Sequence, residues 1–292
     1  MRVKRAAIIV VALVLAIGGA LLAFRALDPL GYLDAKREAR LALGLPKLWS
    51  HDYNVDTRGL AAVACPSNAL VIVTGGQSNA ANALSDPLPA DPAVPAYMAL
   101  GGKCYPLRDP ILGATAKGGS LWTAMGAALT RATGRPVVFI NGAVGGSQIG
   151  DWLDDRSGYR QHLAAEVVAA RRAGVAANYV FWVQGETDAF ALVEPATFVA
   201  QLQALIAGLD PATGAVPWLV YRSTHCMERR GNGPEIDAAV TALAARSNRV
   251  VLGPNASALG PEMRHDGCHF NAAGRDALVA ETLAIVGPRL AR

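Results

Sequence analysis

A serine in the setting of a catalytic nucleophile follows the first strongly apolar run of the chain body. Residues Ala69–Val73 are all apolar and predict a buried strand, which ends at Gly75 and Gly76, and Ser78 comes two residues later. A buried strand that ends abruptly in glycines and then presents a serine is how an α/β sheet exposes a nucleophile. Serine alone is a weak nucleophile, so the chain must also supply a base within hydrogen-bonding distance.

The segment His265–Phe270 offers that base. His269 is the preferred candidate because Asp266, three residues earlier, can accept the proton on the second ring nitrogen, fix the tautomer and stabilise the imidazolium. His265 is a poorer candidate, since the adjacent Asp266 is badly placed to orient it. Together Ser78, Asp266 and His269 predict an enzyme that cleaves or transfers an ester.

Strands and helices alternate along the part of the chain that carries these residues. The predicted strands are residues 69–74, 136–140, 179–183, 216–221 and 249–252. The predicted helices are residues 120–133, 159–173, 195–208, 234–247 and 271–286. Continuous Val- and Ile-rich strands between helices indicate a mostly parallel sheet covered on both faces. We expect residues 82–118 to form a long loop that contains proline and glycine.

Chemically suggestive segments follow four of the five predicted strands. They are Gly75–Asn79, Asn141–Ser147, Gln184–Asp188 and Asp266–His269. Ligands of such sheets bind beyond the carboxyl ends of the strands. We therefore expect these four segments to converge on one site.

The four segments, in this order, resemble the sequence blocks of the SGNH (GDSL-like) hydrolases. The variants Gly-Gln-Ser-Asn, Gly-Gly-Ser and Gln-Gly-Glu-Thr-Asp are similar to the sialate O-acetylesterase-like branch of the carbohydrate esterases. The resemblance extends over about residues 69–285. It implies a flavodoxin-like three-layer α/β/α sandwich with five parallel strands in the order 2-1-3-4-5. It also implies the roles of nucleophile, orienting acid and base for Ser78, Asp266 and His269.

An acyl-transfer transition state needs donors aimed at its developing oxyanion. The backbone N–H of Ser78 is one candidate, and the resemblance implies two more, the N–H of Gly146 and the side-chain amide of Gln184. The wider family has an asparagine at this third place, so the longer Gln184 side chain changes the geometry. Glu186 is a candidate for orienting Gln184 or contacting substrate, and Gln77 for orienting groups or binding substrate.

Trp152 and His225 are candidates for lining a sugar site, since aromatic rings stack on pyranose faces. Nothing in residues 82–118 identifies a substrate. The expected chemistry requires no cofactor and no metal ion.

Four cysteines suit an oxidising compartment, where disulfides persist, and they allow three pairings. We expect Cys226 to pair with Cys268, because both would lie at the same edge of the sheet, which leaves Cys65 with Cys104. Four unpaired thiols are one alternative, and a zinc site is another. Its ligands would be His225, Cys226, His265, Cys268 and His269, a spacing unlike that of structural zinc sites.

An uncharged apolar segment, Ala6–Phe24, precedes the body of the chain. As a helix it would span about 28 Å, close to the hydrocarbon thickness of a bilayer. Arg2, Lys4 and Arg5 in front of it predict a cytoplasmic N-terminus and an exported body. A cleaved signal peptide and a buried core helix are the alternatives. The expected parts are a signal anchor with a transmembrane helix (residues 1–25), a juxtamembrane spacer (26–60) and an SGNH-type esterase domain (61–292).

The net charge of +4 comes from the N-terminal segment. Without the four basic residues at positions 2, 4, 5 and 25, the chain has 23 basic and 23 acidic residues. A nucleic-acid-binding protein needs a basic surface, so this balance argues against that class. With 52% hydrophobic and 17% charged residues, the composition also excludes a disordered chain.

We therefore expect a membrane-anchored, extracytoplasmic serine esterase that removes an acetyl or similar small acyl group from a carbohydrate. An O-acyltransferase with the same triad, acting on a cell-envelope polysaccharide, is the nearest alternative. A non-catalytic carbohydrate-binding or assembly protein is the second, and the intact set of Ser78, Asp266 and His269 argues against it. These patterns leave the natural substrate and the oligomeric state open.

Overall fold

The computed structural model describes residues 17–23, 52–227 and 231–290. The chain divides into two compact units, Met1–Leu48 and Trp49–Arg292. In the first unit the described residues, 17–23, are helical. Across the described ranges, no helix has both the length and the apolar character needed to cross a membrane. Most of the expected signal anchor and spacer lies outside these ranges, so the anchor and the three-part division of the chain stay predictions.

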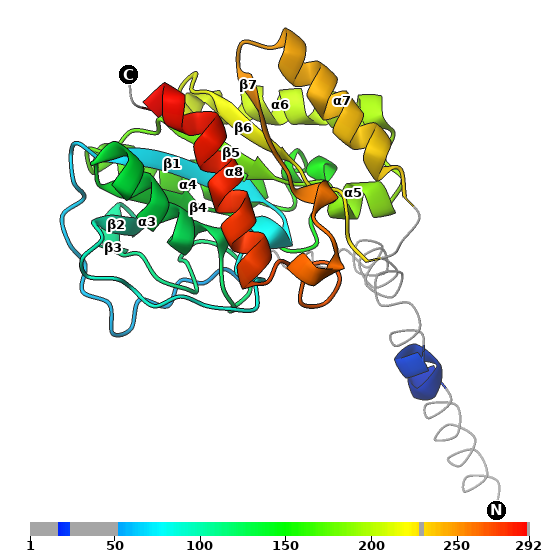
Figure 1. The fold of residues 1–292 in the computed structure, drawn as a ribbon, viewed down its shortest axis with the longest axis horizontal. Coiled ribbons are helices and arrows are strands. Elements are labelled where there is room, and N and C mark those ends of the chain that lie inside the picture. The colour runs from blue at the N-terminus through cyan, green and yellow to red at the C-terminus, as the bar shows by residue number, and fades with distance from the viewer. Residues whose placement is uncertain (1–16, 24–51, 228–230, 291–292) are drawn as a thin grey trace, which may run out of the picture. The chain divides into compact units, whose positions relative to one another are not determined.

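The second unit is built on a seven-stranded sheet with the order β3-β2-β4-β1-β5-β6-β7 (Figure 1). The strands are β1 (Leu70–Gly76), β2 (Ala96–Leu100), β3 (Lys103–Pro106), β4 (Val137–Asn141), β5 (Tyr179–Val183), β6 (Trp218–Arg222) and β7 (Val250–Asn255). The five predicted strands are β1, β4, β5, β6 and β7. They lie side by side, pair in parallel and follow the expected order 2-1-3-4-5.

The expectation of only five strands is wrong, because residues 96–106 add two. β2 pairs in parallel with β4, and β3 pairs antiparallel with β2. Gly101 (φ 58°) and Gly102 (φ 75°) join β2 to β3. Two successive positive φ values give a tight turn whose twist matches that of a hairpin, and glycine adopts them without steric cost. The expected loop 82–118 therefore contributes the edge of the sheet.

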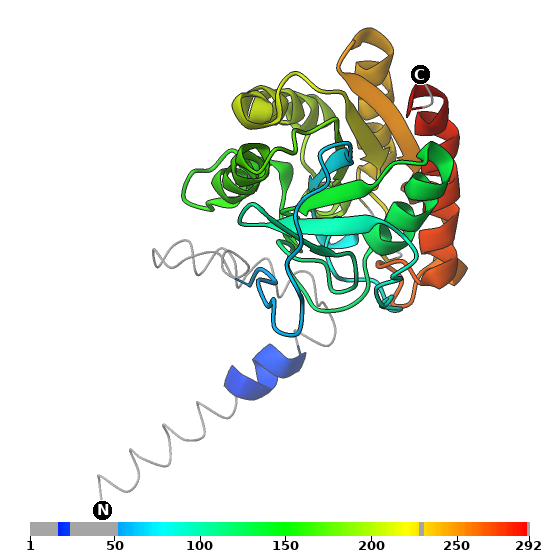
Figure 2. The ribbon, with the colours of Figure 1, turned by 90° about the vertical axis from the view of Figure 1, so that its left-hand side faces the viewer.

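Helices cover both faces of the sheet (Figure 2). Their bounds are α3 (Leu121–Thr133), α4 (Tyr159–Arg172), α5 (Glu186–Phe190), α6 (Pro195–Thr213), α7 (Gly233–Arg246) and α8 (Ala272–Leu290). Side chains alternate between the faces of a strand, and β1 shows it clearly. Leu70 and Ile72 pack with residues of α3 and α8, whereas Val71 and Val73 pack with residues of α4, α6 and α7. The result is the expected three-layer α/β/α arrangement.

All four cysteines form the two expected disulfides, Cys65–Cys104 and Cys226–Cys268. The alternative of four unpaired thiols is therefore wrong. The zinc alternative also fails, because its two thiolate ligands are used in one of the disulfides. Disulfides persist in oxidising compartments, so the pairing supports a location outside the cytoplasm.

Candidate active site

The end of β1 brings Ser78 to the carboxyl edge of the sheet. A Cβ atom on Gly75 would lie 2.4 Å from the Trp182 ring, and one on Gly76 would lie 1.9 Å from the Val183 carbonyl oxygen. Only glycine permits this close approach of β1 to β5. The N–H of Gln77 then donates to the Val183 carbonyl (3.0 Å), and the short 3₁₀ helix Ser78–Ala80 begins.

The loop after β4 runs along the end of β1 and reaches Ser78. The Val144 N–H donates to the Gly76 carbonyl (3.0 Å), and a Cβ atom on Gly145 would lie 3.7 Å from the Ser78 Cβ. The Gly145 N–H already donates to Thr115 Oγ1 (2.8 Å). Gly146 is exposed, with φ of 70°. Neither its N–H nor that of Ser78 has an acceptor within residues 52–227 and 231–290, which leaves both free to bind an oxyanion.

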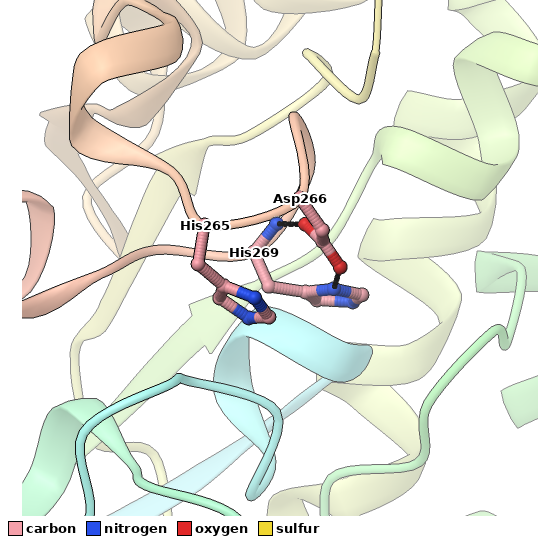
Figure 3. A group of neighbouring side chains, drawn as sticks. All are labelled: His265, Asp266 and His269. Carbon is pink, nitrogen blue, oxygen red and sulfur yellow. Dashed lines mark hydrogen bonds and ion pairs between the residues drawn. The ribbon is translucent and has the colours of Figure 1, made fainter.

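The loop after β7 contributes Asp266 and His269, whose side chains are hydrogen-bonded to each other (Figure 3). Asp266 Oδ2 lies 2.7 Å from His269 Nδ1. Its Oδ1 accepts the backbone N–H groups of Cys268 (2.9 Å) and His269 (2.7 Å). Burial raises the pKa of the Asp266 carboxyl, but the hydrogen bonds from His269 and Cys268 outweigh it and hold that pKa well below its usual range. Asp266 is therefore ionised at neutral pH and orients the imidazole.

Buried Arg264 and a disulfide fix the loop on which His269 sits. The Arg264 guanidinium donates to the carbonyls of Cys268 and, at 2.7 Å, Ala256. It also lies 4.4 Å from the centre of the Phe270 ring, a cation–π contact. The His265 N–H closes the loop on the His269 carbonyl (2.9 Å), and Cys268 is bonded to Cys226. His269 therefore stands on a well-anchored turn.

Asn79 joins the turn that bears Ser78 to the loop that bears His269. Its Nδ2 lies 3.3 Å from the Cys268 carbonyl and 2.7 Å from Glu186 Oε1, and its Oδ1 accepts the Phe270 N–H (3.3 Å). The residue that follows Ser78 is thus bonded to both neighbours of His269. Asn79 was not among the predicted site residues, although it belongs to the Gly-Gln-Ser-Asn motif.

Glu186 is buried and contacts Asn79. Its Oε1 accepts hydrogen bonds from Asn79 and from Ser223 Oγ (both 2.7 Å), and its Oε2 is buried without a partner in the described part of the chain. Burial raises the pKa of Glu186, against the hydrogen bonds from Asn79 and Ser223. We expected Glu186 to orient Gln184 or to contact substrate. Its hydrogen bonds go instead to the residue after Ser78 and to the end of β6.

Gln184 is turned into the protein. Its Nε2 lies 2.7 Å from both the Ser147 carbonyl and Asp188 Oδ2, and 3.2 Å from Gln77 Oε1. An amide nitrogen has two protons to donate, so these three acceptors leave none for an oxyanion. The expected role of Gln184 as third donor does not fit this arrangement.

Gln77 and Asp188 complete this buried cluster. Gln77 Oε1 also accepts the Thr187 N–H (3.1 Å), and Asp188 Oδ1 accepts the Ile149 N–H (2.8 Å). Burial raises the pKa of Asp188 to about 7, although the hydrogen bonds from Ile149 and Gln184 oppose the shift. Of the two roles expected for Gln77, orientation fits its position and substrate contact does not.

Trp152 and His225, the two aromatic candidates for a sugar site, differ in their exposure. Trp152 is fully buried, its ring lies 4.7 Å from that of Trp182, and its Nε1 donates to Ser147 Oγ (3.2 Å). It is therefore a core residue, and the expectation that it lines a sugar site is wrong. His225 lines a pocket of about 280 Å³ together with Glu186, Asp237 and Ser257. Burial and the nearby Arg264 lower the pKa of His225.

Comparison with solved structures shows the same fold in other proteins. A protein from Arabidopsis thaliana is 16% identical, with a TM-score of 0.59 over 76% of this chain and 98% of its own. A protein from Parabacteroides merdae, described as a putative GDSL-like lipase, is 11% identical, with a TM-score of 0.51 over 77% of this chain and 98% of its own. No curated protein sequence matches the chain.

A family model fits most of the second unit. The model describes a carbohydrate esterase, sialic acid-specific acetylesterase, and it matches residues 68–284. The matched range includes all four segments that meet at the end of β1. This chain belongs to that family of carbohydrate esterases, whose members are carboxylic ester hydrolases.

Proposed function

We propose that the protein is a serine acetylesterase of carbohydrates with Ser78 as nucleophile, His269 as general base and Asp266 as the residue that orients the base. The observation that carries the proposal is the set of hydrogen bonds made by the Asn79 side chain. It bonds the turn that bears Ser78 to both neighbours of His269, whose Nδ1 is already held by Asp266.

The first half of the reaction forms an acyl-enzyme. His269 Nε2 takes the proton of the Ser78 hydroxyl as Ser78 Oγ attacks the carbonyl carbon of the ester. The N–H groups of Ser78 and Gly146 bind the oxyanion that develops. The intermediate collapses, and the carbohydrate oxygen leaves with the proton from His269.

Water completes the cycle. His269 removes a proton from a water molecule as the water oxygen attacks the acyl carbon, and it then returns that proton to Ser78 Oγ. The products are the free carboxylic acid and the enzyme in its starting state. Asp266, ionised throughout, stabilises the imidazolium in both halves of the cycle.

The family and the disulfides support the substrate class and the location. The family model describes acetylesterases of a carbohydrate, which supports an O-acetylated carbohydrate as substrate. Two disulfides support action outside the cytoplasm. Among the residues that the structure describes, no specific contact favours an acyltransferase or a non-catalytic binding protein over hydrolysis.

Hydrolysis of a small chromogenic acetate ester tests the triad. We expect Ser78→Ala and His269→Ala each to lower kcat by at least about 10³-fold, and a serine-directed phosphonate to label the wild type but not Ser78→Ala. Ser67→Ala, at an exposed serine, is the matched control and should be fully active. Turnover that survives in both Ser78→Ala and His269→Ala would disprove the assignment.

A further inference from the structure

We propose that His265, Asp266 and His269 form a binding site for a Zn²⁺ ion, and that the bound ion inhibits the Ser78 centre. The three side chains lie together on the loop after β7, with the two imidazole rings side by side (Figure 3). His265 is the residue that the esterase mechanism leaves without a role.

The distances between the three ligand atoms suit a metal site that contracts slightly when the ion binds. Each of the three residues offers one ligand atom, and these atoms lie within 4.8 Å of one another. Zinc–ligand bonds of about 2.1 Å in a tetrahedron separate the ligand atoms by about 3.4 Å. The widest separation therefore has to close by no more than about 1.4 Å. Rotation of the exposed His265 side chain supplies that movement and gives up the hydrogen bond between His265 Nε2 and the Ala83 carbonyl (3.2 Å).

The ligand types are those that zinc prefers. Two imidazole nitrogens and one carboxylate oxygen form a common set of three protein ligands, with a fourth position for water. His265 and Asp266 are both exposed, so an ion reaches them directly from solvent. The rings of His265 and His269 lie 5.9 Å apart, centre to centre, and only 26° from parallel.

The backbone already holds the three residues in place. The His265 N–H donates to the His269 carbonyl (2.9 Å), and Arg264 and Phe270 pair on either side of the loop. The Cys226–Cys268 disulfide fixes the same loop, because Cys268 lies between the two histidines in sequence. Little backbone conformational entropy is therefore lost when the ion binds.

A zinc ion at this place removes the base. Coordination by Nδ1 of His269 displaces the proton from that nitrogen and breaks its bond to Asp266 Oδ2, now 2.7 Å long. The neutral ring then carries its proton on Nε2, which can no longer accept the proton of Ser78. Coordination by Nε2 occupies the lone pair that would accept the Ser78 proton. In either case His269 no longer activates Ser78.

Zinc binding is measured first, without substrate. Calorimetric titration of the full chain with ZnCl₂ should show one ion bound, and Co²⁺ at the same site should give the absorption spectrum of a four-coordinate centre. We expect His265→Ala to weaken zinc binding by at least about tenfold, because one ligand is lost. His225→Ala, which removes a histidine outside the cluster, should bind zinc like the wild type. Equal zinc affinity in His265→Ala and the wild type would overturn the proposal.

Inhibition is measured second, and this part rests on the proposed esterase function. Zinc should inhibit the wild type, a chelator should restore its activity, and His265→Ala should need at least about tenfold more zinc for the same inhibition. Without zinc, His265→Ala should hydrolyse ester as fast as the wild type. Activation by zinc, or equal inhibition of both proteins, would overturn the proposal. The calorimetric result remains decisive for the site even if the protein hydrolyses no ester.

Discussion

The side-chain amide of Asn79 donates a hydrogen bond to the backbone carbonyl of Cys268, at 3.3 Å. Asn79 follows Ser78 directly, and Cys268 directly precedes His269. The same side chain accepts the N–H of Phe270, on the other side of His269. One asparagine thus bonds the turn that bears Ser78 to the loop that bears His269, although the two lie at opposite ends of the domain sequence.

Replacement of Asn79 should therefore damage catalysis more than binding. We expect Asn79→Ala to lower kcat by about 10–100-fold with little change in KM, because small misplacements of reacting groups are costly. Steady-state kinetics on a chromogenic acetate would measure this. Asn271→Ala is the control, since the Asn271 side chain bonds to the backbone of Glu262 and Gly274 and not to a neighbour of His269. A kcat for Asn79→Ala equal to that of the control would contradict this role.

The two disulfides offer a matched pair of variants. They close loops of similar length, with separations of 42 residues for Cys226–Cys268 and 39 for Cys65–Cys104. On chain entropy alone each stabilises the fold by about 4 kcal/mol. Double replacement by serine should therefore lower the free energy of unfolding similarly in both cases.

Only one of the two pairs should affect catalysis at temperatures where both variants remain folded. Cys226–Cys268 holds the loop that bears His269, so its removal should lower kcat, whereas removal of Cys65–Cys104 should not. Denaturant unfolding and initial rates, measured side by side, separate the two effects. Equal kcat values for the two variants would show that the disulfide near His269 is purely structural.

Glu186 gives a test that separates positioning from proton transfer. Glu186→Gln keeps Oε1 as the acceptor for Asn79 and Ser223 and removes a carboxyl group whose charged form is disfavoured by burial. We expect it to retain kcat within about threefold and to be at least as stable as the wild type near pH 8, because a buried carboxylate is costly. Glu186→Ala leaves Ser223 and Asn79 short of an acceptor and should cost about 1–3 kcal/mol of stability. Equal loss of kcat in both variants would instead indicate that the carboxylate takes part in the reaction.

The main parallel strands and the meeting of the four loops were predictable because they depend on local patterns. Buried runs such as Val71–Val73 and Val180–Val183 have no alternative to a covered strand, and parallel strands bring their carboxyl ends to one edge. The hairpin β2–β3 was missed, although Gly101-Gly102 between two short apolar runs is a hairpin signal. The surrounding prolines and glycines of residues 82–118 concealed it.

The directions in which the site side chains point could not be predicted from the sequence. Gln184 has three acceptors that come from the segments after β1, β4 and β5, so its inward orientation depends on the packed fold. Trp152 looked like a loop aromatic, but Trp182 and Ser147 bury it. Arg264, which supports the loop that bears His269, and Ser223, which bonds to Glu186, belong to no motif. Their roles arise only where β6 and the last loop meet.

Asp188 should make stability depend on pH in an unusual direction. Its pKa is about 7 in the folded protein, because burial disfavours the carboxylate, against about 3.9 in an unfolded chain. Between these values the folded state binds a proton that the unfolded state does not. This contribution to stability is therefore complete below about pH 4 and is lost as the pH rises to 7, by up to about 4 kcal/mol. Glu186, whose pKa is also raised, acts in the same direction, whereas Asp266, with a lowered pKa, acts in the opposite one.

Urea unfolding of wild type and Asp188→Asn at several pH values between about 4.5 and 7.5 measures this contribution. The asparagine does not titrate, so the difference in unfolding free energy between the two proteins should shift in favour of the variant as the pH rises. Asn is expected to cost some stability at every pH, because its Nδ2 faces the Nε2 of Gln184 in place of the carboxylate. The slope with pH is therefore the decisive quantity, and parallel curves for the two proteins would show that Asp188 is ionised throughout this range.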